Sequence, residues 1–291
     1  MGGPLDSKEQ VVAEGGLPDR TTRQTKPKDV WASGAAYEPY VGRWSRLVAR
    51  EFLAWLGVPP GSLWLDVGCG TGALSETILA LASPREVQGV DASEGYVAFV
   101  RERVRDARAT FAVGNARALP CETGAYDAAV SGLVLNFVPQ PELAVAEMAR
   151  AARPGGAVAA YVWDYAGQMQ LMRHFWDAAV ALDPGALDLD EGRRFPLCKP
   201  DPLRQLFGGA GLDGVEVRAI DVPTHFRDFD DYWSPFLGGQ GPAPTYAMSL
   251  SEGRRAALRD RVRASLPVAP DGSIRLVARA WAERGRVPLR G

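Results

Sequence analysis

Apolar positions follow two different periods along the chain, and their succession predicts the order of the secondary-structure elements. Short apolar runs end in polar residues or glycine, and most are followed by stretches with apolar residues every three or four positions. The first pattern is typical of buried strands and the second of amphipathic helices. We therefore expect strands near residues 62–67, 86–91, 109–113, 126–131, 157–163, 214–221 and 274–280, and helices near 44–56, 71–82, 93–107, 141–153, 201–210 and 250–265.

The order of these elements predicts an α/β fold. Strands and helices alternate through residues 62–163, and such βαβ units build a parallel sheet with helices on both faces. The second half is less regular and contains two long segments, about 165–210 and 222–272, which we expect to be helical insertions forming a lid over a substrate. An aromatic cluster in the second insertion either lines an apolar pocket or forms the insertion's own small core: Phe226, Phe229, Tyr232, Trp233 and Phe236.

Composition bounds the domain organisation and the class of partner. Residues 1–29 are polar and without a period, so we expect a disordered tail before a single domain over residues 30–291. The net charge is −2, with no basic block, which argues against a nucleic-acid partner. Three widely spaced cysteines and two histidines predict neither a metal site nor a disulfide framework. Without a secretory signal or a long apolar run, the chain is expected to be cytoplasmic and not bound to a membrane.

The strand predicted near 62–67 ends in the most informative local pattern. Asp66 is followed by Gly68, Gly70 and Gly72, and a helical pattern begins immediately afterwards. Such a loop lets a ligand approach the backbone and presents the free N–H groups of a helix N-terminus. A pyrophosphate-binding loop has the spacing G-x-G-x-x-G, and an acidic residue here repels a pyrophosphate. A nicotinamide-dependent oxidoreductase is therefore disfavoured.

The loop resembles motif I of the class I S-adenosylmethionine (SAM) dependent methyltransferases. Further segments match that family in the same order: Asp91 at a strand end, Asn115 and Ala116 after the third strand, residues 126–133, and the turn 153–156. The matches cover about residues 60–163. The resemblance implies a Rossmann-like, doubly wound and mostly parallel seven-stranded sheet, with an antiparallel last strand inserted between strands five and six.

The same resemblance implies roles for individual residues in SAM binding. Asp91 would accept both ribose hydroxyls, although a helix N-cap is the alternative because Ser93 follows it. Ala92 would pass under the adenine ring, and Asn115 and Ala116 would meet the adenine edge. The remaining positions implied along the cofactor are Asp66, Gly68, Cys69, Gly70, Ser131 and Leu133.

Residues 37–46 resemble the N-terminal helix of the small-molecule methyltransferases of ubiquinone and menaquinone synthesis. In such enzymes this segment folds over SAM. Arg43 would then pair with the methionine carboxylate, and Tyr37 and Trp44 would shield the sulfonium, because aromatic faces attract cations. The alternative for Trp44 is a place in the apolar stripe of its own helix.

Transfer of the SAM methyl group is an in-line displacement. The protein mainly has to align the acceptor atom with the methyl group and exclude water, so the sequence need not contain an obvious catalytic base. Candidates for proton transfer are Asn136, Asp164, His174 and His225, although a lone histidine beside an apolar stripe is usually structural and Asp164 could simply cap the next helix. We expect a methyltransferase that acts on a small-molecule acceptor and releases S-adenosylhomocysteine (SAH). The alternative is a SAM-binding subunit without catalysis, and the target atom stays open among O, N, S and C.

Overall fold

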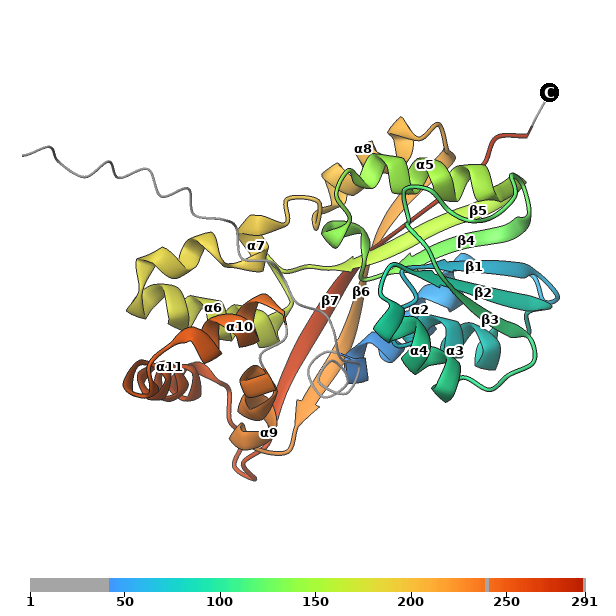
Figure 1. Cartoon of the computed structure of the whole chain (residues 1–291). Coiled ribbons are helices and arrows are strands. Elements are labelled where there is room, and N and C mark those ends of the chain that lie inside the picture. The colour runs from blue at the N-terminus through green and yellow to red at the C-terminus, as the bar shows by residue number, and fades with distance from the viewer. Residues whose placement is uncertain (1–41, 239–240, 290–291) are drawn as a thin grey trace, which may run out of the picture.

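The computed structural model describes residues 42–238 and 241–289, so the tail expected over residues 1–29 and the candidate Tyr37 lie outside the described residues. The described residues build a seven-stranded sheet of order β3-β2-β1-β4-β5-β7-β6 (Figure 1). Strand β7 pairs antiparallel with both its neighbours, and the other pairs are parallel, which confirms the predicted topology. The strands are β1 Leu63–Val67, β2 Glu86–Asp91, β3 Ala109–Val113, β4 Tyr126–Gly132, β5 Ala152–Trp163, β6 Asp213–Phe226 and β7 Ile274–Arg286.

Helices cover both faces of the sheet, as expected from the βαβ alternation. One face is covered by α2 (Arg43–Leu56), α3 (Ala73–Leu81) and α4 (Glu94–Arg103), and the other by α5 (Pro141–Ala151) and α8 (Pro200–Gly209) (Figure 1). The apolar stripe of α2 is buried against the sheet through Val48, Phe52 and Leu56. The helix ends at Gly57, whose left-handed backbone lets its N–H bond the carbonyl oxygen of Leu53.

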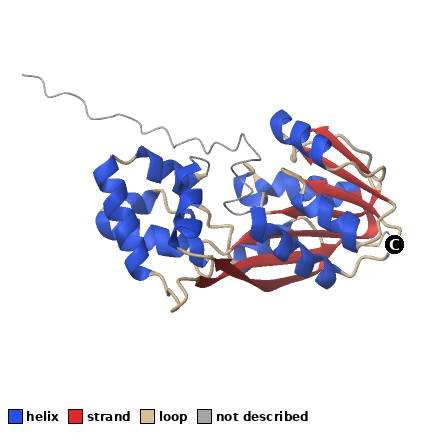
Figure 2. Ribbon diagram, turned by 90° about the horizontal axis from the view of Figure 1, so that it is seen from below, coloured by secondary structure: helices blue, strands red, loops and turns tan. Residues whose placement is uncertain are grey.

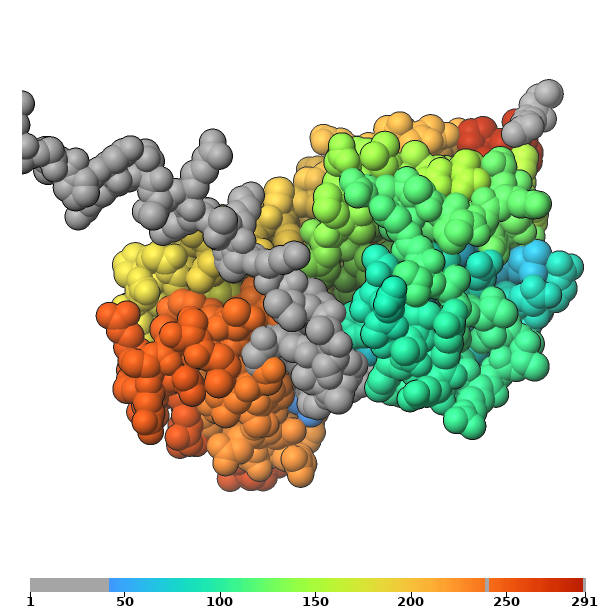
Figure 3. Space-filling view, in the orientation of Figure 1, coloured from blue at the N-terminus to red at the C-terminus, as the bar shows by residue number. Residues whose placement is uncertain are grey.

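The other helices form a separate group, here called the cap, made of residues 165–199 and 227–273. The cap lies beside the ends of β6 and β7 (Figures 1 and 2), and in Figure 3 it forms a lobe of its own, in yellow and orange, next to the green and cyan part of the molecule. Its elements are α6 Gln170–Leu182, η3 Pro184–Asp188, α7 Glu191–Arg194, α9 Phe229–Trp233, η4 Ser234–Gly238, α10 Pro242–Ser249 and α11 Glu252–Ser265.

The predicted aromatic cluster forms the core of the cap. Phe236 stacks on Phe175 of α6 with ring centroids 4.5 Å apart, and Tyr232 packs against Phe226 at 5.2 Å. Tyr232, Phe226 and Phe236 have no exposed surface. Of the two interpretations left open by the sequence, the core is therefore the one observed, and this core joins the two insertions to each other.

Strand β6 is longer than the segment 214–221 expected from the sequence. It continues to Phe226 and stays paired with β7 to that residue, although it contains Pro223. Alternate side chains from Ile220 to Phe226 are buried. Proline is tolerated because β6 is an edge strand, where one row of N–H groups has no partner strand. His225, expected at the start of the insertion, consequently lies within the strand opposite Arg275 and is exposed.

No helix in the described part of the chain is long and apolar enough to span a bilayer. Within residues 42–238 and 241–289, no group of histidine, cysteine and acidic side chains is arranged to hold a metal ion.

Candidate functional site

The glycine loop after β1 is folded against the ends of neighbouring strands. The N–H groups of Gly68 and Cys69 both donate to the carbonyl oxygen of Val90 on β2, at 2.7 and 3.1 Å. Gly68 has φ +77°, and a Cβ on it would lie 2.5 Å from Val134, so only glycine fits. Gly70 also has a positive φ, but a Cβ there would meet nothing closer than 4.0 Å. The loop therefore packs against protein at Gly68, whereas the space next to Gly70 is empty and accessible to a ligand.

Asp91 at the end of β2 is held in a defined orientation by the backbone. Its Oδ2 accepts the N–H of Gly70 at 2.9 Å, and its Oδ1 accepts the N–H of Ser93 at 2.8 Å. Burial raises the pKa of the Asp91 carboxyl, while the two N–H donors act in the opposite direction. Each oxygen keeps acceptor capacity, so the carboxylate can bind two hydroxyl groups while it anchors the loop.

Asp66 is a buried acid with one unsatisfied oxygen. It is 1% exposed, its Oδ2 accepts the hydroxyl of Ser75 at 2.6 Å, and its Oδ1 has no hydrogen-bond partner among the described residues. Burial raises the pKa of Asp66 to about 7, and the nearby negative charge of Asp91 adds to this. A buried carboxylate oxygen without a partner is energetically costly, and a positively charged or hydroxyl-bearing ligand would satisfy it.

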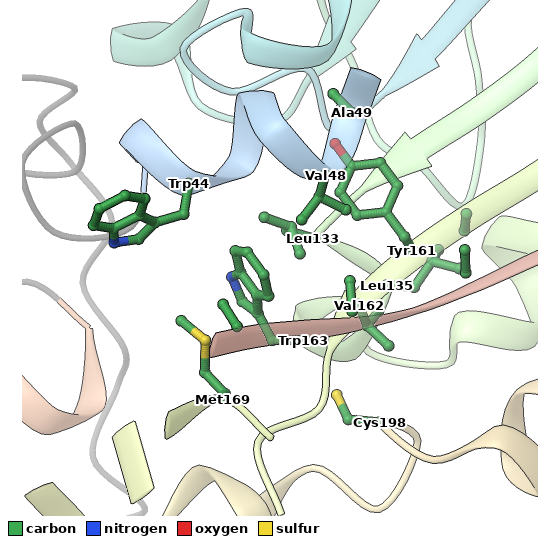
Figure 4. Close-up of a cluster of buried hydrophobic side chains, with 14 of the residues drawn as sticks. Trp44, Val48, Ala49, Leu133, Leu135, Tyr161, Val162, Trp163, Met169 and Cys198 are labelled. Carbon is green, nitrogen blue, oxygen red and sulfur yellow. The ribbon is translucent and has the colours of Figure 1, made fainter. Parts of the chain in front are cut away.

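A cavity of about 180 Å³ extends from the glycine loop to a group of aromatic rings. At one end it is lined by Asp66, Gly68, Cys69, Gly70, Thr71 and Asp91, and elsewhere by Leu133, Val134, Phe137, Tyr161, Trp163 and Tyr165. Tyr161 and Trp163 lie two residues apart on β5 and project toward α2, as Figure 4 shows together with Val48 and Trp44. The cavity lies at the carboxyl ends of the parallel strands, where ligands bind in open α/β sheets.

Residues 65–160 match the family described as "Methyltransferase domain", and this segment contains the glycine loop, Asp91 and Leu133. Over residues 65–160 the chain therefore carries a SAM-dependent methyltransferase domain.

Relatives and solved structures agree with this assignment. The chain is 27% identical over 237 residues to the 2-methyl-6-phytyl-1,4-hydroquinone methyltransferase of Synechocystis sp., covering 73% of each protein. It is 37% identical over 116 residues to the demethylmenaquinone methyltransferase of Shouchella clausii, covering 38% of this chain and 48% of that protein. The second match therefore spans about half the length of that relative.

A nucleic-acid enzyme is also among the relatives. The tRNA (carboxymethyluridine(34)-5-O)-methyltransferase ALKBH8 of Mus musculus is 37% identical over 123 residues, which cover 41% of this chain and 17% of that protein. Among solved structures, phosphoethanolamine N-methyltransferase 2 of Haemonchus contortus, in complex with phosphomonomethylethanolamine and SAH, has a TM-score of 0.56 and 18% identity, covering 87% of this chain and 56% of that chain. At this identity the likeness shows the fold of the methyltransferase domain.

Half of the predicted cofactor residues that the structure describes line the cavity of the methyltransferase domain, and half do not. Those that line it are Asp66, Gly68, Cys69, Gly70, Asp91 and Leu133. Ser131 is buried on β4, and its hydroxyl donates to the carbonyl oxygen of Val67. Asn115 is exposed and its Oδ1 accepts the N–H of Arg117, while Ala92 and Ala116 lie near the ends of β2 and β3.

Arg43 and Trp44 lie at the start of α2, next to the cap. The Arg43 guanidinium sits over the rings of Trp44 and Phe226, at 4.4 and 4.8 Å, and its Nη1 donates to Asp231 of α9 at 3.2 Å. The Nε and Nη2 of Arg43 and the Nε1 of Trp44 are buried donors without an acceptor among the described residues. The two side chains therefore link the sheet to the cap and still offer three donor nitrogens.

None of the four candidates for proton transfer lines the cavity of the methyltransferase domain. Asp164 Oδ2 accepts the N–H of Gln168 at 2.9 Å, so it closes the turn before α6 and does not cap that helix, whose N-cap is Met169. His174 lies on α6, where its Nδ1 is 3.2 Å from the hydroxyl oxygen of Ser265 of α11, and burial lowers its pKa. Both polar atoms of the Asn136 amide are buried without a partner among the described residues.

The sequence interpretation missed the aromatic wall of the cavity. Tyr161 and Trp163 alternate along the carboxyl end of a strand, which was a usable signal because ligands bind there. Phe137 lies in the short helix η2 (Leu135–Phe137) after β4 and Tyr165 in the turn after β5, and no local pattern distinguishes them from ordinary apolar residues. Leu133 has a φ of +62°, which is unusual for a residue other than glycine, and its N–H donates to the carbonyl oxygen of Tyr161.

Proposed function

We propose that the protein transfers the methyl group of SAM to a small, apolar and aromatic acceptor. The observation that carries the proposal is the cavity, which joins the loop at Gly70 and Asp91 to the rings of Phe137, Trp163 and Tyr165 without interruption. Pockets for small molecules are lined mainly by apolar and aromatic side chains with a few polar groups that orient the ligand. The quinone-directed activities named for two relatives point in the same direction.

The residues at the loop end fit the cofactor. Two oxygens of Asp91, already oriented by backbone N–H groups, suit the two ribose hydroxyls, and the unpartnered Oδ1 of Asp66 suits the ammonium group. Gly70 leaves room above the loop, because a side chain there would project into open space. SAM supplies an electrophilic methyl group when it is bound.

Further cofactor contacts expected from the family resemblance stay part of this proposal. The Nε and Nη2 of Arg43, which have no acceptor among the described residues, suit the methionine carboxylate, and the indole of Trp44 beside them would face the sulfonium. Asn115 and Ala116 would meet the adenine edge at the ends of β2 and β3. Tyr37 is proposed for the same role as Trp44.

The chain's own residues would orient the acceptor and exclude water. The apolar walls at Leu133, Val134 and Trp163 remove solvent from the acceptor end, which favours displacement over hydrolysis. Among the aromatic residues of the lining, the phenols of Tyr161 and Tyr165 are groups able to hold a proton. Asp164, Asn136, His174 and His225 are not assigned this role, because they lie outside the lining.

Two measurements test the proposal. Calorimetric titration with SAH is expected to show one-to-one binding, with NAD as the control ligand that should not bind. Transfer of a labelled methyl group from SAM is then measured with hydroquinones, catechols and transfer RNA as acceptors. Methylation of a hydroquinone or catechol alone is the expected result, whereas methylation of transfer RNA alone would overturn the small-molecule assignment.

The alternative function is a SAM-binding subunit that does not turn over its cofactor. The observation in its favour is that none of the four residues proposed for proton transfer reaches the cavity. Binding of SAH without methyl transfer to any acceptor in the panel would support this alternative.

A further inference from the structure

Phe195 lies behind the aromatic wall of the cavity without lining it. Its ring centroid is 5.0 Å from that of Phe137, with the planes at 75°, and 5.6 Å from that of Tyr165. Phe137 and Tyr165 line the cavity, and Phe195 is buried behind both. Aromatic pairs in contact prefer edge-to-face or offset geometry, so a shift of one ring changes the position of its neighbours.

The two supported rings come from segments that no strand ladder holds in place. Phe137 ends the short helix η2 (Leu135–Phe137) after β4, and Tyr165 follows the end of β5. Positions of this kind are free to vary more than strand residues such as Trp163. A fixed wall at this end of the cavity therefore needs support from another part of the chain.

An ion pair between α6 and the start of α7 supplies this support. The Nη1 of Arg173 donates to the carbonyl oxygen of Tyr165 at 2.8 Å and to Asp190 Oδ1 at 3.0 Å, and its Nη2 donates to Asp190 Oδ2 at 2.6 Å. The side chains of Arg173 and Asp190 are 16% and 9% exposed. A two-pronged contact between a guanidinium and a carboxylate fixes both distance and orientation. Tyr165 and the start of α7 are thereby held by the same arginine.

Helix α7 is short and tightly placed, so this contact also positions Phe195. Asp190 caps α7 by accepting the N–H of Gly192 at 2.8 Å, and Phe195 is the residue that ends the helix. A Cβ on Gly192 would lie 2.7 Å from Arg173 Nη1 and 3.0 Å from the carbonyl oxygen of Tyr165. The backbone of α7 therefore touches the Tyr165 segment directly, and Phe195 has little freedom to move.

We infer that Phe195 is a positioning residue for acceptor specificity, which holds the rings of Phe137 and Tyr165 at the spacing that admits a planar aromatic acceptor. The Arg173–Asp190 ion pair fixes Phe195 in turn. This inference rests on the proposed function and adds the residue that keeps the acceptor end selective for flat rings. With Phe195 shortened, the two rings relax into the vacated space and the preference for a flat ligand is lost.

The test compares two ligands with the same carbon skeleton, the flat 2-naphthol and the saturated trans-2-decalol. Each is titrated calorimetrically into protein saturated with SAH. The unmodified protein is expected to bind 2-naphthol about tenfold more tightly than trans-2-decalol. Phe195→Leu is expected to reduce this ratio to about two while the Kd for SAH changes less than about twofold.

Phe236→Leu is the matched control. It also removes a buried ring, but one that stacks on Phe175 and packs against Tyr232 and Trp233 in the cap core. This variant is expected to lose stability and to keep the tenfold ratio. An equal fall of the ratio in both variants would mean that Phe195 acts only as core, and the inference would be overturned.

Asp190→Asn provides a second route if Phe195→Leu does not fold. The amide oxygen still accepts the N–H of Gly192, while the charge that pairs with Arg173 is removed. A ratio reduced to about three supports the inference, and an unchanged ratio contradicts it. A lack of preference for 2-naphthol in the unmodified protein would also overturn it. Failure to bind SAH is a different result, because it refutes the proposed function itself.

Discussion

Replacement of Asp66 by asparagine should make the ligand-free protein more stable at alkaline pH while weakening its binding of the cofactor product. Asp66 is 1% exposed and holds one hydrogen bond, from the hydroxyl of Ser75. Burial raises the pKa of its carboxyl from 3.8 to about 7. Asparagine keeps the acceptor for Ser75 and has no charge at any pH, so it removes only the titration.

The sign and the size of the effect follow from linkage. Because the pKa of Asp66 is higher in the folded than in the unfolded state, the folded state holds the proton more tightly. Its contribution to stability is complete below about pH 4 and is lost as the pH rises through about 7. Each unit is worth ~1.36 kcal/mol, and between pH 5 and pH 8 the loss runs over the roughly two units below the folded pKa of about 7, so it amounts to on the order of 3 kcal/mol. Asp66→Asn should therefore gain about this much more stability over the unmodified protein at pH 8 than at pH 5.

Urea unfolding at the two pH values, without ligand, measures this difference. The buried Glu191 and Glu283, whose pKa values burial raises to about 8, also titrate in this range, but they are present in both proteins and cancel in the comparison. Asp106→Asn is the control, because the half-buried Asp106 pairs with Arg108, which lowers its pKa to about 2, below the range tested. If the unfolding free energies of the unmodified protein and of Asp66→Asn changed in parallel from pH 5 to pH 8, the reasoning would be refuted.

Three further predictions concern the site. Gly70→Val should abolish SAH binding in calorimetry while urea unfolding stays cooperative, because a side chain at Gly70 projects into the cavity rather than into protein; retained binding would contradict the open face of the loop. Asp91→Ala should weaken SAH binding by about 1–3 kcal/mol, since it removes a charged acceptor that also anchors the N–H of Gly70; an unchanged Kd would exclude the ribose assignment. His174→Gln should leave both the Kd for SAH and the rate of methyl transfer within about twofold, because His174 contacts Ser265 of α11 and not the cavity; a loss of transfer with normal SAH binding would show that His174 takes part in catalysis.

Local patterns predicted the parts of the protein whose partners are close in the chain. The glycine loop could be recognised because Asp66, Gly68 and Gly70 act within one turn between a strand and a helix. The sheet could be predicted because burial on both faces leaves continuous apolar runs, and right-handed βαβ connections leave few topologies. The end of β6 was missed because Pro223 resembles a strand terminator, whereas the edge position that makes it harmless is a property of the assembled sheet.

The sequence by itself determined the class of fold, the place of the glycine loop and the acid at the end of β2. Only the tertiary structure decided that Asp164 closes a turn, that His174 packs against α11, and that four aromatic residues meet at one end of the cavity. The physical reason is that burial, desolvation and ring packing depend on contacts between segments far apart in the chain. Phe195 shows this most clearly, since its role arises from a distance of 5.0 Å to a ring 58 positions earlier.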